Sequence, residues 1–144
     1  MIQRIQTIYL LLATLVSGGL IFVFNLWTNL AENQVFTIDL LEEESLLLKT
    51  IPVLFLTTAI GFTIIIFLFK NRKLQFVLVR IVILINLFLL GILIYLSLTL
   101  PGETAVSLKG IGMFLPIIVI LLCGLSNKAI RKDENLVKSA DRLR

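Results

Sequence analysis

The sequence predicts an all-α membrane protein, a bundle of four transmembrane helices with both chain ends in the cytoplasm. The chain is 58% hydrophobic and 15% charged, and its mean hydropathy of +1.05 lies outside the usual range of soluble domains. Four long apolar stretches follow one another, and Lys and Arg gather at alternate ends of them. We therefore expect a single membrane domain over residues 1–144, with little chain left for a soluble domain.

The first two stretches predict helices over about residues 5–27 and 51–69. The first is longer than the apolar core of a typical signal peptide, and no small-residue cleavage site follows it, so we expect an uncleaved helix. Trp27 would anchor it at the bilayer interface. In the second helix, Thr50 can cap the start and Pro52 falls in the expected first turn, where no amide hydrogen bond is lost.

The third and fourth helices are expected over about residues 76–98 and 106–126. The third ends before Pro101, a usual stop signal. The uninterrupted apolar part of the fourth is shorter than a bilayer requires, and it contains Gly112 and Pro116. Whether Pro116 kinks this helix stays open at the level of the sequence.

The orientation follows from the basic residues near the helix ends, because Lys and Arg are enriched on the cytoplasmic side. Eleven lie before the first helix, around the turn between the second and third, or after the fourth: Arg4, Lys70, Arg72, Lys73, Arg80, Lys128, Arg131, Lys132, Lys138, Arg142 and Arg144. The opposite ends carry Lys49 and Lys109. Both termini are therefore expected inside, with an outer loop over 29–50.

The residue types needed for most catalysis are missing or isolated. There is no histidine, the one cysteine, Cys123, lies in an apolar stretch, and no carboxylate falls inside a predicted span. These absences disfavour an enzyme, a metal centre, a cofactor site and a proton-coupled carrier. The outer loop holds the run Glu42 to Glu44, which lacks the spaced ligands of a calcium site, and a short strand or interface-lying segment is expected over 36–40.

A few polar and small residues inside the predicted spans suggest helix packing. Asn86 lies near the middle of the third helix, where its side chain should face another helix. The small-residue pairs at four-residue spacing are Ala13 with Ser17, Thr14 with Gly18, and Thr57 with Gly61, and they predict close contact of the first two helices. The alternative interpretation is a polar path lined by Asn86, Ser17, Thr57 and Thr58.

The tail over residues 127–144 predicts a helix that continues from the fourth span. It contains no Gly or Pro, and Glu134 precedes Lys138 by four residues. A narrow apolar stripe, interrupted by one acid, follows Ala129, Asp133, Leu136, Ala140 and Leu143. Topology signalling alone explains the basic residues, whereas docking of a partner explains the apolar ones as well. The candidate docking residues are Arg131, Lys132, Leu136, Val137, Ala140 and Leu143. The interleaved acids and the absence of aromatic residues argue against nucleic acid as a partner.

The two ends of the chain carry recognisable motifs, the opening MIQRIQTIYLLL and the ending NKAIRKDE followed by SADRLR. With these ends the chain resembles a family of small four-helix membrane proteins from Bacteroidetes, classed as a domain of unknown function. The resemblance covers the whole chain. It implies four spans in the inner membrane of a Gram-negative bacterium, and it brings no activity, ligand or site residue.

Two functional hypotheses from different classes result. The first is a non-enzymatic accessory or scaffold protein of the bacterial inner membrane, which docks a cytoplasmic or membrane partner through its basic C-terminal helix. The second is a transporter or channel for a small molecule or lipid, either as a single chain or as a homo-oligomer, in which the polar path described above crosses the bilayer.

Overall fold

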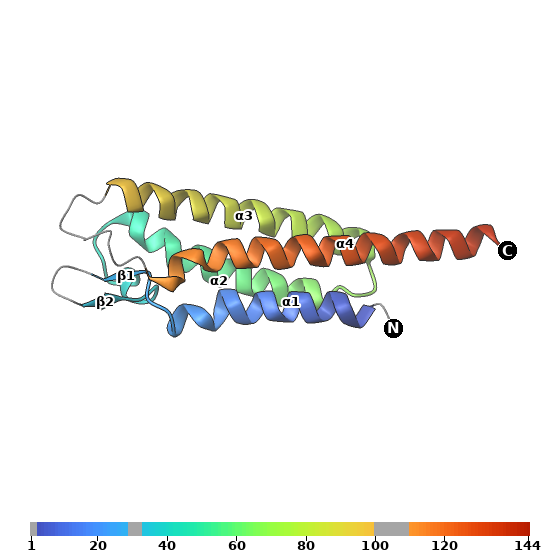
Figure 1. Cartoon of the computed structure of the whole chain (residues 1–144), viewed down its shortest axis with the longest axis horizontal. Helices are drawn as coiled ribbons and strands as arrows, with labels where there is room; N and C mark the ends of the chain where they lie inside the picture. The colour runs from blue at the N-terminus through green and yellow to red at the C-terminus, as the bar shows by residue number, and fades with distance from the viewer. Residues whose placement is uncertain (1–2, 29–32, 100–109) are drawn as a thin grey trace.

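A computed structural model describes residues 3–28, 33–99 and 110–144, and within these residues four long helices form an antiparallel bundle (Figure 1). The helices are α1 Gln3–Gly18, α2 Leu46–Phe67, α3 Arg72–Thr99 and α4 Leu115–Arg142. Each helix packs against its neighbours in the chain, and the most extensive contact is that of α1 with α4, which closes the bundle. The segments containing these helices are long and apolar enough to cross a bilayer, as expected of a multi-pass membrane protein.

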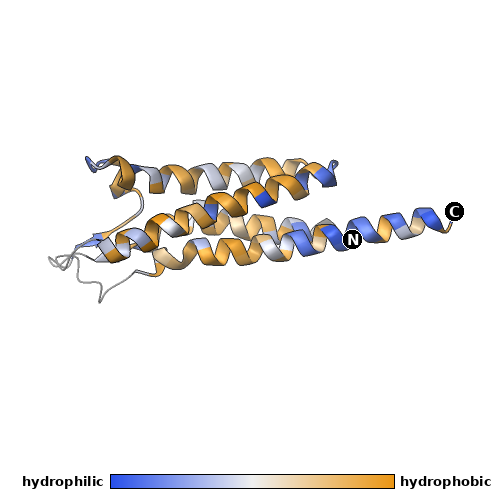
Figure 2. Ribbon diagram, turned by 90° about the horizontal axis from the view of Figure 1, so that it is seen from above, coloured by the Kyte–Doolittle hydropathy of each residue, from blue (hydrophilic) through white to orange (hydrophobic). Residues whose placement is uncertain are grey.

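The outer surface of the bundle is largely apolar. Large side chains such as Leu84 and Phe88 are exposed, each at 65%, and Figure 2 shows hydrophobic residues around most of the four helices. Inside, one apolar cluster surrounds Phe62 and a second surrounds Phe55. A surface of this kind is unfavourable in water and suits a hydrocarbon solvent.

Short irregular elements cover the end of the bundle opposite the two termini. They are the 3₁₀ helices η1 Leu20–Phe22, η2 Asp39–Leu41 and η4 Ile111–Phe114, and the strands β1 Trp27–Thr28 and β2 Gln34–Val35. The strands pair antiparallel, with Trp27 opposite Val35. Leu40 of η2 is buried and packs in the Phe55 cluster, so this cover closes one end of the core.

Two glycines allow the chain before α4 to approach the chain after α1. The amide of Gly110 donates to the carbonyl oxygen of Leu26 at 2.8 Å, and the amide of Gly112 donates to that of Asn25 at 3.0 Å. A Cβ at Gly110 would collide with the Asn25 carbonyl, and one at Gly112 would lie 2.7 Å from the same oxygen. Glycine at both positions is therefore a steric requirement of this backbone contact.

The beginning and end of the first two helices differ from the sequence prediction. The first was expected to reach Trp27, but α1 ends at Gly18 and continues only as the 3₁₀ turn η1, since the successive glycines 18 and 19 weaken the helix. Helix α2 begins at Leu46, so Pro52 lies in its interior instead of its first turn. Thr50 does not cap this helix; its hydroxyl donates to the Leu47 carbonyl at 2.6 Å.

The third and fourth helices also start at other positions than expected. Helix α3 begins at Arg72 because the Asn71 side chain accepts the amide of Leu74 at 3.3 Å. Helix α4 begins at Leu115 with Pro116 in its first turn, where proline causes no kink. It then runs without interruption to Arg142, as predicted for a tail that continues the fourth helix. Residues 106–109 of the predicted fourth span lie outside the described residues.

The strand lies earlier in the outer loop than the expected segment 36–40. Residues 34–35 form β2, whereas the amide of Phe36 donates to the carboxylate of Asp39 at 2.9 Å. This side-chain bond turns the backbone away from the strand and leads into η2. The alternating segment 36–40 therefore forms a turn followed by the 3₁₀ helix η2, in which Leu40 is the buried residue.

The small residues allow close helix contacts, although their partners differ partly from the prediction. A Cβ added to Gly18 of α1 would lie 3.1 Å from the Cβ of Ala59 on α2, which confirms that Gly18 faces protein. Gly61 of α2 faces α3 instead of α1, since a Cβ added there would lie 3.3 Å from Cγ2 of Val82. Thr57 is exposed on the outer surface and takes no part in the interface.

We predict that Gly18→Leu destabilises the bundle by about 1–3 kcal/mol, because the larger side chain forces α1 away from α2. Gly91→Leu is the matched control, since a Cβ at Gly91 meets no atom within 4 Å. Thermal unfolding of the purified variants in detergent measures both. Equal stability of the Gly18 and Gly91 variants would contradict the close contact of α1 with α2.

Candidate functional site

Three of the four predicted intramembrane polar residues point into the bundle. Asn86, Ser17 and Thr58 are fully buried, whereas Thr57 is exposed on the outer surface. The expectation that Asn86 faces inward is confirmed. Thr57 is not brought together with the other three, because its position on α2 turns it away from the core.

The buried polar side chains are satisfied mainly by their own helices. The hydroxyls of Ser17 and Thr58 donate to the carbonyls of Ala13 and Phe55, at 2.9 and 2.8 Å. The Asn86 amide nitrogen donates to the Val82 carbonyl at 2.9 Å, while its Oδ1 has no hydrogen-bond partner among the described residues. This pattern is typical of polar residues in membrane helices.

Within the four helices, sequence reasoning missed three buried polar residues, Gln6, Gln75 and Ser126. The side-chain amide of Gln75 donates through Nε2 to the carbonyl of Ile65 at 3.3 Å and thereby joins α3 to α2. Gln6 Nε2 and Ser126 Oγ have no partner among the described residues. All three lie toward the helix ends that the sequence assigns to the cytoplasm, where polar residues are common and give no signal of burial. Their burial depends on which face of each helix meets the bundle.

An ion pair joins the tail part of α4 to the start of α3. Arg72 Nη1 lies 3.3 Å from Asp133 Oδ2, and Asp133 is only 7% exposed. Because Asp133 Oδ2 has no hydrogen-bond partner among the described residues, its contact with Arg72 is an ion pair without a hydrogen bond. The acid that interrupts the predicted apolar stripe is thus buried, and its ion pair with Arg72 adds to the packing of α4 against α3.

The buried stripe of α4 is distinct from the apolar stripe that the sequence predicts on the tail. Its members are Val119, Cys123, Ser126, Ile130 and Asp133. Of the predicted stripe, only Asp133 belongs to this set, and Leu136, Ala140 and Leu143 are exposed. The predicted tail stripe was offered as a surface for a partner, and its members beyond position 133 remain exposed, whereas the residues that pack in the bundle lie on a neighbouring face of the same helix.

Residues 135–142 form the last two turns of α4, here called the distal arm, and all of them are exposed. Figure 1 shows this part of α4 extending beyond the other three helices. Where the arm begins, Lys138 Nζ lies 2.9 Å from Glu134 Oε1, at the predicted spacing. The hydrogen bond from Lys138 lowers the pKa of Glu134. The pair is therefore present at neutral pH and lost as the pH falls through that lowered pKa.

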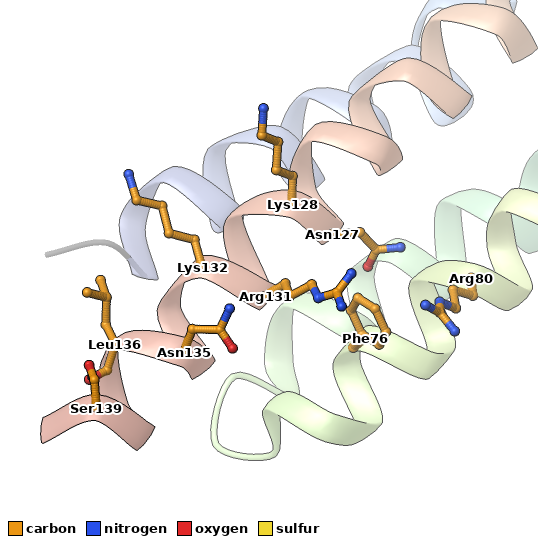
Figure 3. A pocket seen from close by; sticks show the side chains of 9 residues that line it. All are labelled: Phe76, Arg80, Asn127, Lys128, Arg131, Lys132, Asn135, Leu136 and Ser139. Carbon is orange, nitrogen blue, oxygen red and sulfur yellow. The ribbon is translucent and has the colours of Figure 1, made fainter. Parts of the chain in front are cut away.

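The candidate docking residues divide between two places. Val137, Ala140 and the C-capping Leu143 lie in or next to the distal arm. Arg131 and Lys132 instead line a groove of about 700 Å³ between α3 and α4 (Figure 3). Leu136 lies at the start of the arm and lines the end of that groove.

The described residues bring together no group of three His, Cys, Asp or Glu side chains that would hold a metal ion. The run Glu42 to Glu44 is exposed in the outer loop. The geometry thus consists of a closed apolar bundle, a basic groove and a projecting arm.

Comparison with known proteins gives one relationship. No match was found among curated proteins or solved structures. A family model described as a domain of unknown function, DUF4293, matches residues 2–143, nearly the whole chain. The chain with this four-helix bundle therefore belongs to the DUF4293 family.

Proposed function

We propose that this protein is a non-enzymatic accessory or scaffold protein of the bacterial inner membrane, which docks a partner protein on the distal arm. The observation that carries the proposal is the exposure of the arm on a helix continuous with the bundle. Leu136 and Val137 are 46% and 44% exposed, and Leu143 is 90% exposed. Three large apolar side chains beyond the predicted membrane span favour burial against a second protein.

The arm is held in a defined direction, which supports a docking role over that of a loose tail. Ile130 is buried in the bundle, and the Arg72–Asp133 contact holds the following turn against α3. The next turn is reinforced by the Glu134–Lys138 pair. A partner would thus meet a preformed helix and would not have to order a flexible segment, which lowers the entropic cost of binding.

The side chains of the arm favour a partner with an apolar groove bordered by acids. Leu136, Ala140 and Leu143 follow one another at spacings of four and three, which places them on one face of a helix. Lys138 and Arg142 lie on the opposite side. An amphipathic helix of this kind binds by laying its apolar face into a groove, and the basic residues on its outer side favour association with a partner whose surface around that groove is acidic.

The cytoplasmic placement of the arm rests on the basic residues and on the antiparallel bundle. Both described chain ends and the α2–α3 turn lie at the same end in Figure 1, and this end carries the basic cluster. The positive-inside rule assigns it to the cytoplasm.

We predict that cysteines at Lys73 and Ser139 react with an impermeant maleimide only after the inner membrane is opened. A cysteine at Glu43 should react in intact spheroplasts, because its loop is outside. All three positions are exposed, and the variants are made in a Cys123→Ser background. Labelling of the Ser139 variant in intact spheroplasts would reverse the proposed orientation.

We predict that a photo-crosslinking residue at Val137 or Leu143 captures one discrete protein in living cells. Leu136→Ser with Ala140→Ser should abolish the adduct, because it removes the apolar face of the docked helix. A crosslinker at Leu84, exposed on the bundle, is the control. Truncation after Glu134 should also abolish docking and leave the fold intact, since Ile130 and Asp133 are retained. Persistence of the adduct in the serine variant would rule out docking through this face.

The transporter or channel hypothesis is tested at Asn86. We predict that Asn86→Leu costs about 1 kcal/mol or less, because the side chain bonds within its own helix. Asn86→Asp should cost more, since it places an unpaired carboxyl in the core. Unfolding in detergent measures both. A solute flux into proteoliposomes that Asn86→Leu abolishes, with stability unchanged, would favour the channel over the scaffold.

A further inference from the structure

A groove between α3 and α4 collects basic side chains from both helices. It has a volume of about 700 Å³ and is lined by Phe76, Arg80, Asn127, Lys128, Arg131, Lys132, Asn135, Leu136 and Ser139. The four basic residues, here called the groove bases, are Arg80, Lys128, Arg131 and Lys132. Figure 3 shows the Arg131 side chain directed toward the Phe76 ring and the two lysines directed to the other side of α4.

The groove bases have no ion-pair partner among the described residues. The two nearby carboxylates on α4 are engaged elsewhere, Asp133 by Arg72 and Glu134 by Lys138. No acid lines the groove. The groove therefore attracts anions and offers no carboxylate to a cation.

The aromatic ring in the groove is also covered by a cation. The Arg80 guanidinium carbon lies 4.3 Å from the centroid of Phe76. This stacking holds Arg80 at the groove wall. It also leaves that face of the ring unavailable to the ammonium group of a ligand.

A second, smaller groove of about 310 Å³ lies on the other side of α4, against α1. It is lined by Ile5, Tyr9, Leu125, Lys128, Ala129 and Lys132. Lys128 and Lys132 border both grooves. Their ammonium groups thus serve one continuous basic surface that crosses the exposed face of α4.

The basic groove lies where the exposed surface changes from polar to apolar. Toward the apolar side, α3 exposes Leu84 and Leu87, and α4 exposes Leu121. These residues continue the helix faces that carry Arg80 and Lys128. A ligand with an anionic head and an apolar chain could place its head in the basic groove and its chain against the adjoining apolar surface.

From this arrangement we infer that the α3–α4 groove binds an anionic membrane phospholipid. The lipid phosphate accepts charge-assisted hydrogen bonds from Arg131, while Arg80 and the two lysines add their positive charge to the same surface, and the acyl chains lie along α3 and α4. Zwitterionic lipids share the phosphate, but their ammonium group finds no carboxylate among the lining residues, so the groove selects lipids with net negative charge. The groove shares Leu136 with the docking face of the distal arm, but the inference does not require that a partner binds there.

The test measures lipid binding to the intact purified chain by native mass spectrometry in mild detergent. The ligands are phosphatidylglycerol, phosphatidylcholine with the same acyl chains, and glycerol 3-phosphate. The groove variant is Lys128→Gln with Arg131→Gln. The matched control is Arg142→Gln with Arg144→Gln, which removes the same charge from the same part of the chain outside the groove.

We expect the groove variant to bind phosphatidylglycerol about tenfold more weakly or worse, and phosphatidylcholine without change. The control should bind both as the original chain does. The preference of the original chain for phosphatidylglycerol should shrink as salt is raised, which tests the charge dependence without any substitution.

Three results would overturn the inference. Equal binding of the two lipids by the original chain would mean that the bases do not select charge. An equal loss in the control would indicate a general effect of net charge and no groove. Binding of glycerol 3-phosphate as tight as that of phosphatidylglycerol would identify a site for free phosphates instead of a membrane lipid.

Discussion

A backbone surrounded by hydrocarbon must satisfy its own amides and carbonyls, and this requirement shapes the whole fold. No solvent is present in the bilayer core to do so, and an unpaired group costs several kcal/mol. Continuous helices meet this requirement, and the apolar stretches of the chain form four of them in the described residues. The irregular backbone of β1, β2 and the 3₁₀ turns is confined to the end of the bundle.

The same requirement reverses the usual distribution of polar side chains. Asn86, Ser17 and Thr58 are buried while many large aliphatic residues are exposed, because hydrocarbon accepts aliphatic side chains and offers no hydrogen-bond partner to polar ones. The Gln75 bond to Ile65 is an instance in which such a partner comes from another helix. Close packing supplies the remaining cohesion, as at Gly18 and Ala59, since lipid does not drive apolar helices together.

Where α4 leaves the apolar region, an ion pair replaces apolar packing as its contact with α3. Arg72 and Asp133 hold α4 on α3, and the distal arm beyond this contact carries only exposed residues. The groove bases lie beside it, at the boundary of the two surfaces. A single helix thus serves three roles in succession: part of the bundle, wall of a basic groove, and projecting arm.

The motifs at the chain ends indicated a family classed as a domain of unknown function, and the family model agrees with this. The amino-acid sequence was also sufficient to predict the number and approximate place of the helices, the continuity of α4 with its tail and the inward position of Asn86. These features depend on hydropathy over long windows, on local helix signals and on the cost of a polar group in lipid.

Which face of each helix is buried became known only from the folded arrangement. Two other features join residues that are distant in the chain: the approach of Gly110 and Gly112 to Asn25, and the pairing of Arg72 with Asp133. Two more depend on where a helix ends or begins, namely the early end of α1 and the interior position of Pro52. Periodicity predicted an apolar stripe on the tail, which stays exposed from Leu136 on, but it did not indicate which face of α4 packs in the bundle, because this helix carries apolar residues on more than one face. The neighbouring helices α1 and α3 select between those faces, and no local pattern contains that information.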